Sequence, residues 1–214
     1  MCSEPESAFV SDRSNPEWWE ARYRDGDIPW DSGVTPPEVV ALIESGLVEP
    51  GWALDIGCGS GVTSRYLARH GFTVVGIDFS RAALWRATAA ARSENLPCLF
   101  VRGDATDFRL AQVSASLVVD VGCFHSFTFE GRASYRRALA QTLRPGGYYL
   151  LYTFLCDDCP PFVDADADAS ESSRETPSVS YVDIAAFAPQ LALRSAAHGE
   201  DRARHSAWFL MQRA

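Results

Sequence analysis

Short apolar runs alternate with amphipathic stretches along the chain from residue 37 to residue 154. The apolar runs predict buried strands at Ala53–Ile56, Phe72–Asp78, Cys98–Val101, Ser116–Val121 and Tyr148–Phe154. The stretches between them carry apolar residues at helical spacing, and they predict helices at Pro37–Gly46, Val62–Arg69, Ser80–Ser93 and Ala133–Leu143. Strands that alternate with helices imply an α/β fold with a parallel sheet covered on both faces.

The last part of the chain has a different pattern. Residues 156–178 are rich in Asp, Ser, Pro and Ala, which predicts a loop. Two further strands are expected at Leu191–His198 and His205–Gln212, with a turn at Gly199–Arg202 between them. These two strands are therefore expected to form a hairpin at one edge of the sheet.

A glycine-rich turn follows the first strand, in the sequence LDIGCGSG of Leu54–Gly61. Glycine lets the backbone turn tightly and approach a ligand, and the helix that follows offers free N–H groups. A dinucleotide fingerprint would need a glycine where this chain has Val62, so the turn fails the NAD pattern by one residue. A purely structural turn is the alternative, and NAD binding is a further one.

Two acids strengthen the functional interpretation of this turn. Asp78 ends the second strand, where a carboxylate accepts hydrogen bonds from ribose hydroxyls, and Asp104 follows the third strand. Each acid alone is more often a loop residue or a helix cap. Together they place a nucleoside along the carboxyl edge of the sheet, where open α/β sheets bind ligands.

Composition and charge exclude several classes of protein. The 214 residues fit one domain, and no apolar run is long enough to cross a bilayer. The net charge of −9 disfavours nucleic-acid binding, so a small molecule is the expected partner. The N-terminus lacks a basic and then apolar leader, and the six Cys are scattered, so we expect free thiols and a cytoplasmic protein.

Five segments of the chain resemble, in order, the motifs of the class I S-adenosylmethionine-dependent methyltransferases. They are ALDIGCGSG, VVGIDFS, VRGDATDF, LVVDVGCFHSF and LRPGGYYLL. The resemblance implies a Rossmann-like, seven-stranded, mostly parallel sheet with an antiparallel C-terminal hairpin. It implies that S-adenosylmethionine is the cofactor, with Asp55 near its amino group, the glycines along its methionine part, Asp78 on the ribose and Phe79 beside the adenine. The set of cofactor residues that it implies is Trp19, Trp30, Asp55, Gly57, Cys58, Gly59, Gly61, Asp78, Phe79, Asp104, Ala105, Asp120 and Val121.

The N-terminal stretch WWEARYRDGDIPWDSG resembles a narrower group, the thiopurine, thiol/halide and tellurite-resistance methyltransferases. The resemblance implies a lid in which Trp19 and Trp30 shield the reactive methyl; the alternative is that these Trp residues only anchor the segment. Where that group carries Asp-Arg-Gly, this chain has Asp120-Val121-Gly122. The loss of that Arg argues against a cationic contact to the acceptor and against anionic or thiopurine substrates.

A base and a metal site are the remaining candidates. His125 follows the fourth strand and could accept a proton from an amine or hydroxyl acceptor, although a thiolate needs no base. The pair Cys156 and Cys159 has no second metal-binding pair, and Asp164, Asp166, Asp168 and Glu175 fit a calcium loop only partly. We therefore expect no metal.

These observations predict one methyltransferase domain spanning residues 1–214. Within it, residues 11–36 form the lid, 52–154 the cofactor-binding core, 155–180 an acidic loop and 181–214 the hairpin region. The expected reaction is methylation of a small molecule at a soft nucleophile such as a thiol. The alternatives are N- or O-methylation of a natural product with His125 as the base, and a protein that binds S-adenosylmethionine without turnover.

Overall fold

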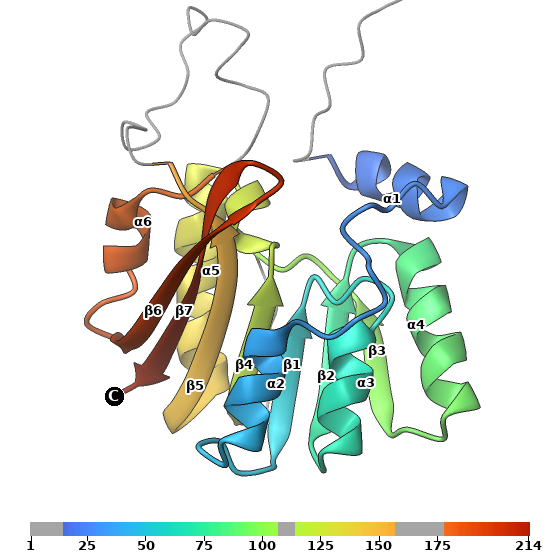
Figure 1. Ribbon diagram of the computed structural model, residues 1–214, viewed down its shortest axis with the longest axis horizontal. Helices are drawn as coiled ribbons and strands as arrows, with labels where there is room; N and C mark the ends of the chain where they lie inside the picture. Colours follow the sequence, from blue (N-terminus) through green and yellow to red (C-terminus); the bar gives the residue numbers. More distant parts are fainter. Residues whose placement is uncertain (1–14, 107–113, 157–177) are drawn as a thin grey trace, which may run out of the picture.

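Seven strands form one mixed sheet in the computed structural model of the chain, which describes residues 15–106, 114–156 and 178–214 (Figure 1). Their order across the sheet is β3-β2-β1-β4-β5-β7-β6. The strands are β1 Trp52–Ile56, β2 Thr73–Asp78, β3 Cys98–Arg102, β4 Ala115–Val121, β5 Leu143–Phe154, β6 Leu191–Asp201 and β7 Arg204–Arg213. The first five run parallel, and β7 runs antiparallel to both β5 and β6. The fold class is the predicted one.

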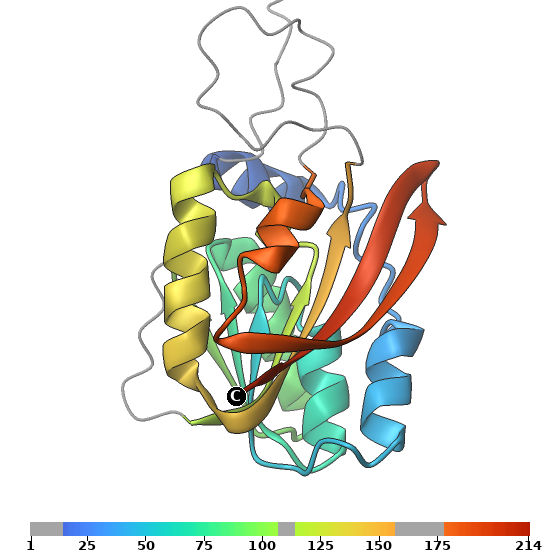
Figure 2. The same cartoon turned by 90° about the vertical axis from the view of Figure 1, so that its left-hand side faces the viewer.

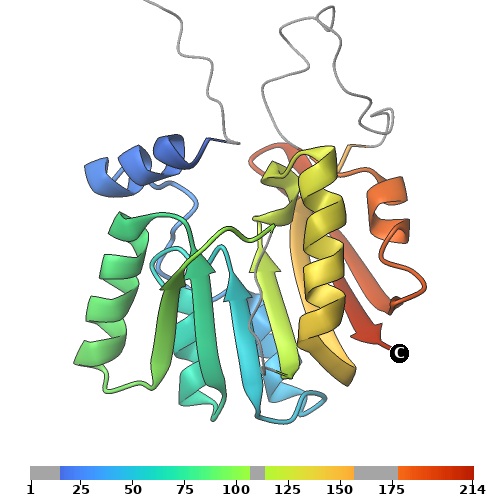
Figure 3. The same cartoon turned by 180° about the vertical axis from the view of Figure 1, so that it is seen from behind.

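Helices cover both faces of this sheet. They are α1 Pro16–Asp25, α2 Pro37–Glu44, α3 Val62–Arg69, α4 Arg81–Ser93, α5 Phe129–Thr142 and α6 Tyr181–Ala185, with the 3-10 helix η1 at Phe124–Ser126. Figure 1 shows α2 and α3 in front of the sheet, and Figure 3 shows α5 on the opposite face. Each face has its own apolar cluster, in which Val39 and Leu67 lie on one side and Tyr135 and Phe209 on the other. The central strands are buried on both faces, which explains their continuous apolar sequences.

Most predicted elements are confirmed, but two boundaries are wrong. α5 begins at Phe129 rather than Ala133, because the Thr128 side chain accepts a hydrogen bond from the backbone N–H of Gly131 and caps the helix earlier. β5 begins at Leu143 rather than Tyr148, and its first part is irregular because the pairing with β4 shifts register there. The short elements η1 and α6 were not predicted.

The C-terminal hairpin is confirmed, with a tighter turn than expected. The turn residues are Arg202 and Ala203, both with positive φ (52° and 58°), so the strands extend through Gly199–Asp201. Two consecutive residues with positive φ are the backbone of a two-residue hairpin turn whose twist matches that of the strands. Figure 2 shows the hairpin extending beyond the end of β5.

The N-terminal segment, residues 15–36, begins with a helix that lies above the carboxyl ends of the parallel strands (Figure 1). α1 is capped by the side chain of Asn15 and ends at Gly26, which has a φ of +81°. The helix is docked on α4, because the Glu20 carboxylate accepts a hydrogen bond from Ser80 Oγ at 2.8 Å and Arg86 donates to the Tyr23 carbonyl at 2.7 Å.

Three expectations from composition can be compared with the described residues. Cys58, Cys98 and Cys123 are free thiols, but Cys156 is disulfide-bonded, so the expectation of free thiols throughout is wrong. Within the described ranges, every helix is too short or too polar to cross a membrane, and acidic and thiol side chains form no metal-binding group. The calcium-loop residues and Cys159 lie outside the described residues, as does most of the predicted acidic loop.

Candidate functional site

A cavity of about 780 Å³ opens at the carboxyl ends of the parallel strands, between the N-terminal segment and the β6–β7 hairpin. Four groups of residues line it, one each from the N-terminal segment, the ends of β1 to β3, the loop after β4, and strands β5 to β7. They include Trp18, Trp19, Tyr23, Trp30; Gly57, Asp78, Phe79, Ala105; Val121, Cys123, His125; and Tyr152, Phe154, His198, Arg202, Arg204, Trp208. The cavity therefore lies at the carboxyl edge of the sheet, the edge along which the sequence pattern predicted a nucleoside.

The glycine-rich turn brings backbone to the cavity wall. Gly57 lines the cavity, and an added Cβ there would lie 2.8 Å from the Cβ of Cys123. At Gly59, which has a φ of +52°, an added Cβ would clash with the Tyr23 hydroxyl, so a larger residue would displace the Tyr23 side chain. Gly61 packs against Ala87 instead and starts α3. Of the three glycines, only Gly57 lines the cavity.

Asp78 joins this turn to the next helix. One carboxylate oxygen accepts a hydrogen bond from the backbone N–H of Gly59 at 2.9 Å, and the other accepts from Ser80 N at 2.8 Å. Burial raises the pKa of Asp78 above its ordinary value, while these N–H donors oppose that rise. Because Asp78 also lines the cavity, it is an acceptor group at the end of β2, as predicted.

Two other predicted acids lie below the cavity wall. Asp55 is 2% exposed and accepts a hydrogen bond from Ser64 Oγ at 2.6 Å. Asp120 is fully buried and accepts from the backbone N–H of Cys123 at 2.7 Å and from the Tyr135 hydroxyl at 2.8 Å. Desolvation raises the pKa of each carboxyl to about 7. Asp55 therefore holds the first turn of α3 and Asp120 holds the segment after β4, and neither lines the cavity.

Only some of the residues predicted to bind the adenine line the cavity. Phe79 and Ala105 line it together with Gly103. Asp104 is exposed, and one of its oxygens accepts from the backbone N–H and hydroxyl of Thr106, at 2.7 and 2.8 Å. Cys58, which was also predicted to bind the cofactor, is buried beneath the turn, and neither it nor Asp104 lines the cavity.

The N-terminal segment contributes an aromatic cluster to the cavity. The Trp19 and Trp30 rings are 5.1 Å apart with an interplanar angle of 73°, and Trp18 stacks on Trp30 at 5.9 Å. Trp30 Nε1 donates a hydrogen bond to the Tyr23 hydroxyl at 3.2 Å, which links the cluster to the glycine-rich turn. The Arg22 guanidinium lies over the rings of both Trp18 and Trp30.

His125 lies on η1, in the segment that follows β4, and lines the cavity. Its side chain is buried, its Nδ1 is 3.5 Å from Thr153 Oγ1, and its ring is 5.1 Å from that of Phe154. The buried Arg132 donates to the His125 carbonyl and forms an ion pair with Asp183 at 2.8 Å. Contacts from β5 and from α5 therefore hold His125, the predicted base, at the cavity.

Sequence reasoning missed the wall formed by β5, β6 and β7. Tyr152 and Phe154 alternate along β5, and Trp208 of β7 contacts Tyr152 with ring centroids 5.0 Å apart. The period-2 aromatic pattern at the end of β5 was the available signal. The argument from Val121 against a cationic contact to the acceptor stays a prediction, although Arg22, Arg202 and Arg204 line the cavity from other elements.

Comparison with known proteins assigns the family. A family model described as "Methyltransferase domain" matches residues 53–147. An uncharacterized methyltransferase of Schizosaccharomyces pombe is 32% identical over 101 residues, which are 47% of this chain and 70% of that protein. The chain belongs to the S-adenosylmethionine-dependent methyltransferases.

Two other relatives of this methyltransferase carry more specific names. The 2-heptyl-1-hydroxyquinolin-4(1H)-one methyltransferase of Mycobacteroides abscessus is 33% identical over 144 residues, which cover 67% of this chain and 63% of that protein. The probable thiol methyltransferase 2 of Arabidopsis thaliana is 30% identical over 144 residues, which cover 65% and 62% of the two chains. The methyltransferase therefore spans less than two thirds of these two relatives.

Solved structures confirm the methyltransferase fold. A structure described by the conversion of a disulfide bond into a thioacetal group during echinomycin biosynthesis matches with a TM-score of 0.74 and 24% identity, covering 92% of this chain and 91% of that one. The 1,6-didemethyltoxoflavin-N1-methyltransferase of Burkholderia thailandensis, solved with S-adenosylhomocysteine, matches with a TM-score of 0.73 and 16% identity, covering 100% and 93%. At these identities the likeness establishes the fold, and the cofactor of the family is S-adenosylmethionine.

Proposed function

We propose that the chain transfers the methyl group of S-adenosylmethionine to a small molecule, at a soft nucleophile such as a thiol sulfur. The observation that carries this proposal is the cavity, which is lined by Gly57, by Asp78 and by aromatic side chains of the N-terminal segment and of β5 to β7. The residues fit the cofactor: the turn at Gly57 leaves backbone exposed to the cavity, and Asp78 offers oxygens that ribose hydroxyls can donate to.

In this proposal the predicted cofactor residues that line the cavity keep the roles that the family resemblance implies. Asp78 holds the ribose, Phe79 and Ala105 flank the adenine, and Gly57 lies along the methionine part. Trp19 and Trp30 form the lid; the hydrogen bond from Trp30 to the Tyr23 hydroxyl, which lies against Gly59, supports this role. Asp55 and Asp120 act through the turns they anchor, because neither lines the cavity.

The sulfonium of the bound cofactor supplies an already activated methyl group. The chain has to align the acceptor with that methyl group and exclude water, a proximity effect that can supply about 7 to 11 kcal/mol. The indole faces of Trp19 and Trp30 can stabilise a nearby sulfonium by about 0.5 to 2 kcal/mol. A thiolate acceptor therefore needs no proton acceptor from the protein.

The relatives support a small acceptor without naming it for this chain. One is named for a hydroxyquinolinone and another for thiols, and both names describe small nucleophiles. Methylation of an oxygen or nitrogen is the second candidate, because His125 lines the cavity and could accept a proton there. The cytoplasmic location expected from cysteine usage stays a prediction, and the Cys156 disulfide argues against its basis.

Calorimetry tests the cofactor assignment. We expect S-adenosylhomocysteine to bind the wild-type chain and NAD not to bind. Asp78→Asn should weaken S-adenosylhomocysteine binding about 10-fold or more, because it removes a charged acceptor and one of the bonds that order the turn. Asp25→Asn, at an exposed position on α1, is the control and should leave binding unchanged. Binding of NAD without S-adenosylhomocysteine would overturn the assignment.

Turnover with a matched set of acceptors tests the reaction. Benzenethiol, phenol and aniline share one ring and differ in the nucleophilic atom, and we expect the thiol to be methylated fastest. If His125→Gln abolished methylation of phenol and aniline only, His125 would be the base of the second candidate reaction. Cofactor binding without methylation of any acceptor would favour a protein that binds the cofactor without turnover.

A further inference from the structure

We propose that Arg204 makes the acceptor end of the cavity selective for planar, negatively charged nucleophiles such as aromatic thiolates. The inference rests on the proposed methyl transfer and specifies its acceptor. It reverses the expectation drawn from Val121, because the cation comes from β7, more than 80 residues further along the chain.

The position of Arg204 is set by the hairpin. It is the first residue of β7, directly after the two-residue turn, and its half-buried side chain lines the cavity. Its guanidinium carbon lies 3.6 Å from the centroid of the Phe154 ring, which is stacking distance. The N–H bonds of a guanidinium lie in its own plane, so a group stacked on a ring directs its donors along the ring surface.

The aromatic neighbours of Arg204 favour a flat ligand. The Phe154 ring is 5.8 Å from that of Tyr152, which in turn contacts Trp208. His125 is 5.1 Å from the same Phe154 ring, so Arg204 lies on the wall that carries the candidate base. A planar acceptor placed against this wall would stack on aromatic rings and meet a cation at its edge.

The other two arginines of the cavity wall contact residues of the N-terminal segment, and Glu38 and Glu200 also line the cavity. Arg22 forms an ion pair with Asp27 at 2.6 Å and lies over two Trp rings, and Arg202 donates to the Pro29 carbonyl. Asp201 accepts a hydrogen bond from the Tyr152 hydroxyl at 2.8 Å. Among the arginines that line the cavity, Arg204 is the one stacked on the wall beside His125.

The charge balance of the reaction says which kinetic constant Arg204 should affect. The acceptor sulfur forms a bond to the methyl carbon, the bond from methyl to sulfonium breaks, and its electron pair stays on the donor sulfur. An anion and a cation thereby become two neutral molecules. A cation beside the acceptor stabilises the bound anion more than the transition state, in which the negative charge is already reduced. Arg204 should therefore lower the KM for an anionic acceptor without raising kcat.

Binding of two unreactive probes to the S-adenosylhomocysteine complex tests the proposal. 4-Nitrophenolate and nitrobenzene share a flat ring, and only the first is charged. By calorimetry above pH 8, we expect the wild-type complex to bind 4-nitrophenolate about 10-fold or more tightly than nitrobenzene, and Arg204→Gln to lose that preference. Arg92→Gln, which removes the same charge from an exposed position on α4, should keep it.

Kinetics with benzenethiol at the same pH provide a second readout. Arg204→Gln should raise the KM about 10-fold and leave kcat unchanged or raise it by up to about threefold, because Arg204 stabilises the bound anion and, more weakly, the transition state. Arg204→Lys keeps the charge without the planar stacking group and should give an intermediate KM. This variant decides the question if Arg204→Gln fails to fold.

Three results would overturn the proposal. The wild-type complex could bind the two probes equally, Arg204→Gln could keep the preference, or Arg92→Gln could lose it as well. Failure of methyl transfer itself is a separate outcome: it would appear as wild-type protein that does not bind S-adenosylhomocysteine or that methylates no acceptor. Retained S-adenosylhomocysteine binding with lost discrimination in Arg204→Gln assigns the effect to the acceptor end.

Discussion

Asp120 is a fully buried carboxyl group that accepts three hydrogen bonds, from the backbone N–H groups of Cys123 and Phe124 and from the Tyr135 hydroxyl. Desolvation outweighs these donors and raises its pKa to about 7. The folded state therefore holds this proton more tightly than the unfolded chain does. The stability that the protonated group contributes is complete below pH 4 and is lost as the pH rises through 7.

Asp120→Asn should flatten this part of the pH dependence, because an amide has no proton to lose. We expect the difference in unfolding free energy between pH 5 and pH 8 to shrink by more than about 1 kcal/mol, measured by urea denaturation. Asp25→Asn, exposed on α1, should follow the wild-type profile. Parallel profiles for the wild type and Asp120→Asn would contradict the shifted pKa.

Single residues also mark the limit of what sequence reasoning could reach. The acids at the strand ends were identified correctly as residues near the carboxyl edge, because a strand end is visible as the end of an apolar run. Whether a side chain enters the cavity depends on local backbone direction: Asp78 lines it, whereas Asp55 turns to Ser64. The approach of Tyr23 to Gly59 joins residues 36 positions apart and has no local sequence signal.

Among the elements, the N-terminal segment has the most specific proposed role. Its Trp residues pack mainly on one another and on Tyr23. These Trp residues are only partly buried, and they belong to neither of the two apolar clusters on the faces of the sheet. Replacing one of these Trp residues should therefore leave the apolar clusters intact. If the segment is a lid, such a change lowers ligand affinity; if it is an anchor, the change lowers stability.

Trp30→Ala tests that distinction. We expect S-adenosylhomocysteine affinity to fall about 10-fold, since the ring contacts with Trp18 and Trp19 and the bond to Tyr23 are lost together. The melting temperature should change little. Trp85→Ala removes an indole that is 74% exposed on α4 and should alter neither property. A lower melting temperature with unchanged affinity would make Trp30 an anchor.

Among the elements, prediction from the sequence succeeded where an element was long enough for its apolar pattern to repeat. The buried strands and the helices α2 to α5 show clear periodicity, and their order was predicted correctly, whereas the ten-residue α1 was not predicted as a helix. η1 and α6 have three and five residues, too few for a helical period to emerge. α6 depends on a capping box formed by Ser180 and Asp183, and Asp183 is held in turn by Arg132 of α5.

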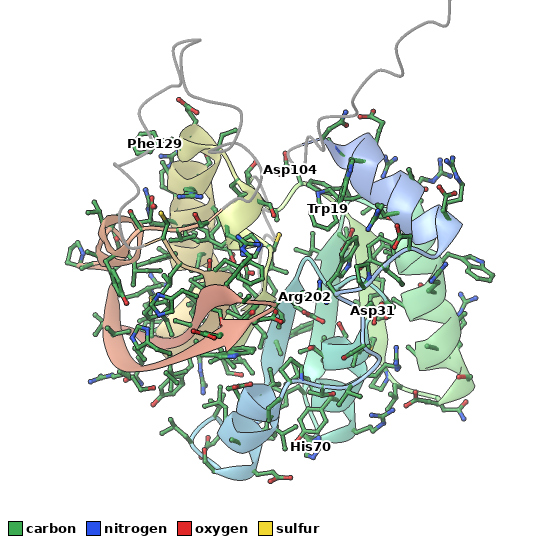
Figure 4. The ribbon with its side chains drawn as sticks, turned by 45° about the horizontal axis from the view of Figure 1, so that its top comes forward. Trp19, Asp31, His70, Asp104, Phe129 and Arg202 are labelled. Atoms are coloured by element: carbon green, nitrogen blue, oxygen red, sulfur yellow. The ribbon has the colours of Figure 1, made fainter. Side chains whose placement is uncertain are left out.

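Across the whole molecule, two distant parts of the chain close the cavity. Arg202, at the tip of the β6–β7 hairpin, donates a hydrogen bond to the carbonyl of Pro29 in the N-terminal segment, 173 positions away. Figure 4 shows Arg202 reaching from the hairpin toward the part of that segment that carries Asp31, with Trp19 farther along the same segment. The contact connects the proposed lid directly to the proposed acceptor wall.

Loss of this contact should speed ligand exchange. Arg202→Asn is the suitable change, because Asn tolerates the positive φ of this turn. We expect the dissociation rate of S-adenosylhomocysteine, measured by stopped-flow tryptophan fluorescence, to rise several-fold, while the unfolding free energy stays within about 0.5 kcal/mol. Arg92→Asn on α4 should change neither value. An unchanged dissociation rate would show that the hydrogen bond does not hold the lid.

The strand order β5-β7-β6 has a consequence for synthesis of the protein. β7 lies between two strands that precede it in the chain, so β6 has no place in the sheet until Arg204–Arg213 has left the ribosome. The nucleoside end of the site depends on β1 to β3 and can form much earlier, since domains fold as the chain emerges. A nascent chain would thus acquire its donor pocket first, and it would gain any ability to select an acceptor only with the last strand.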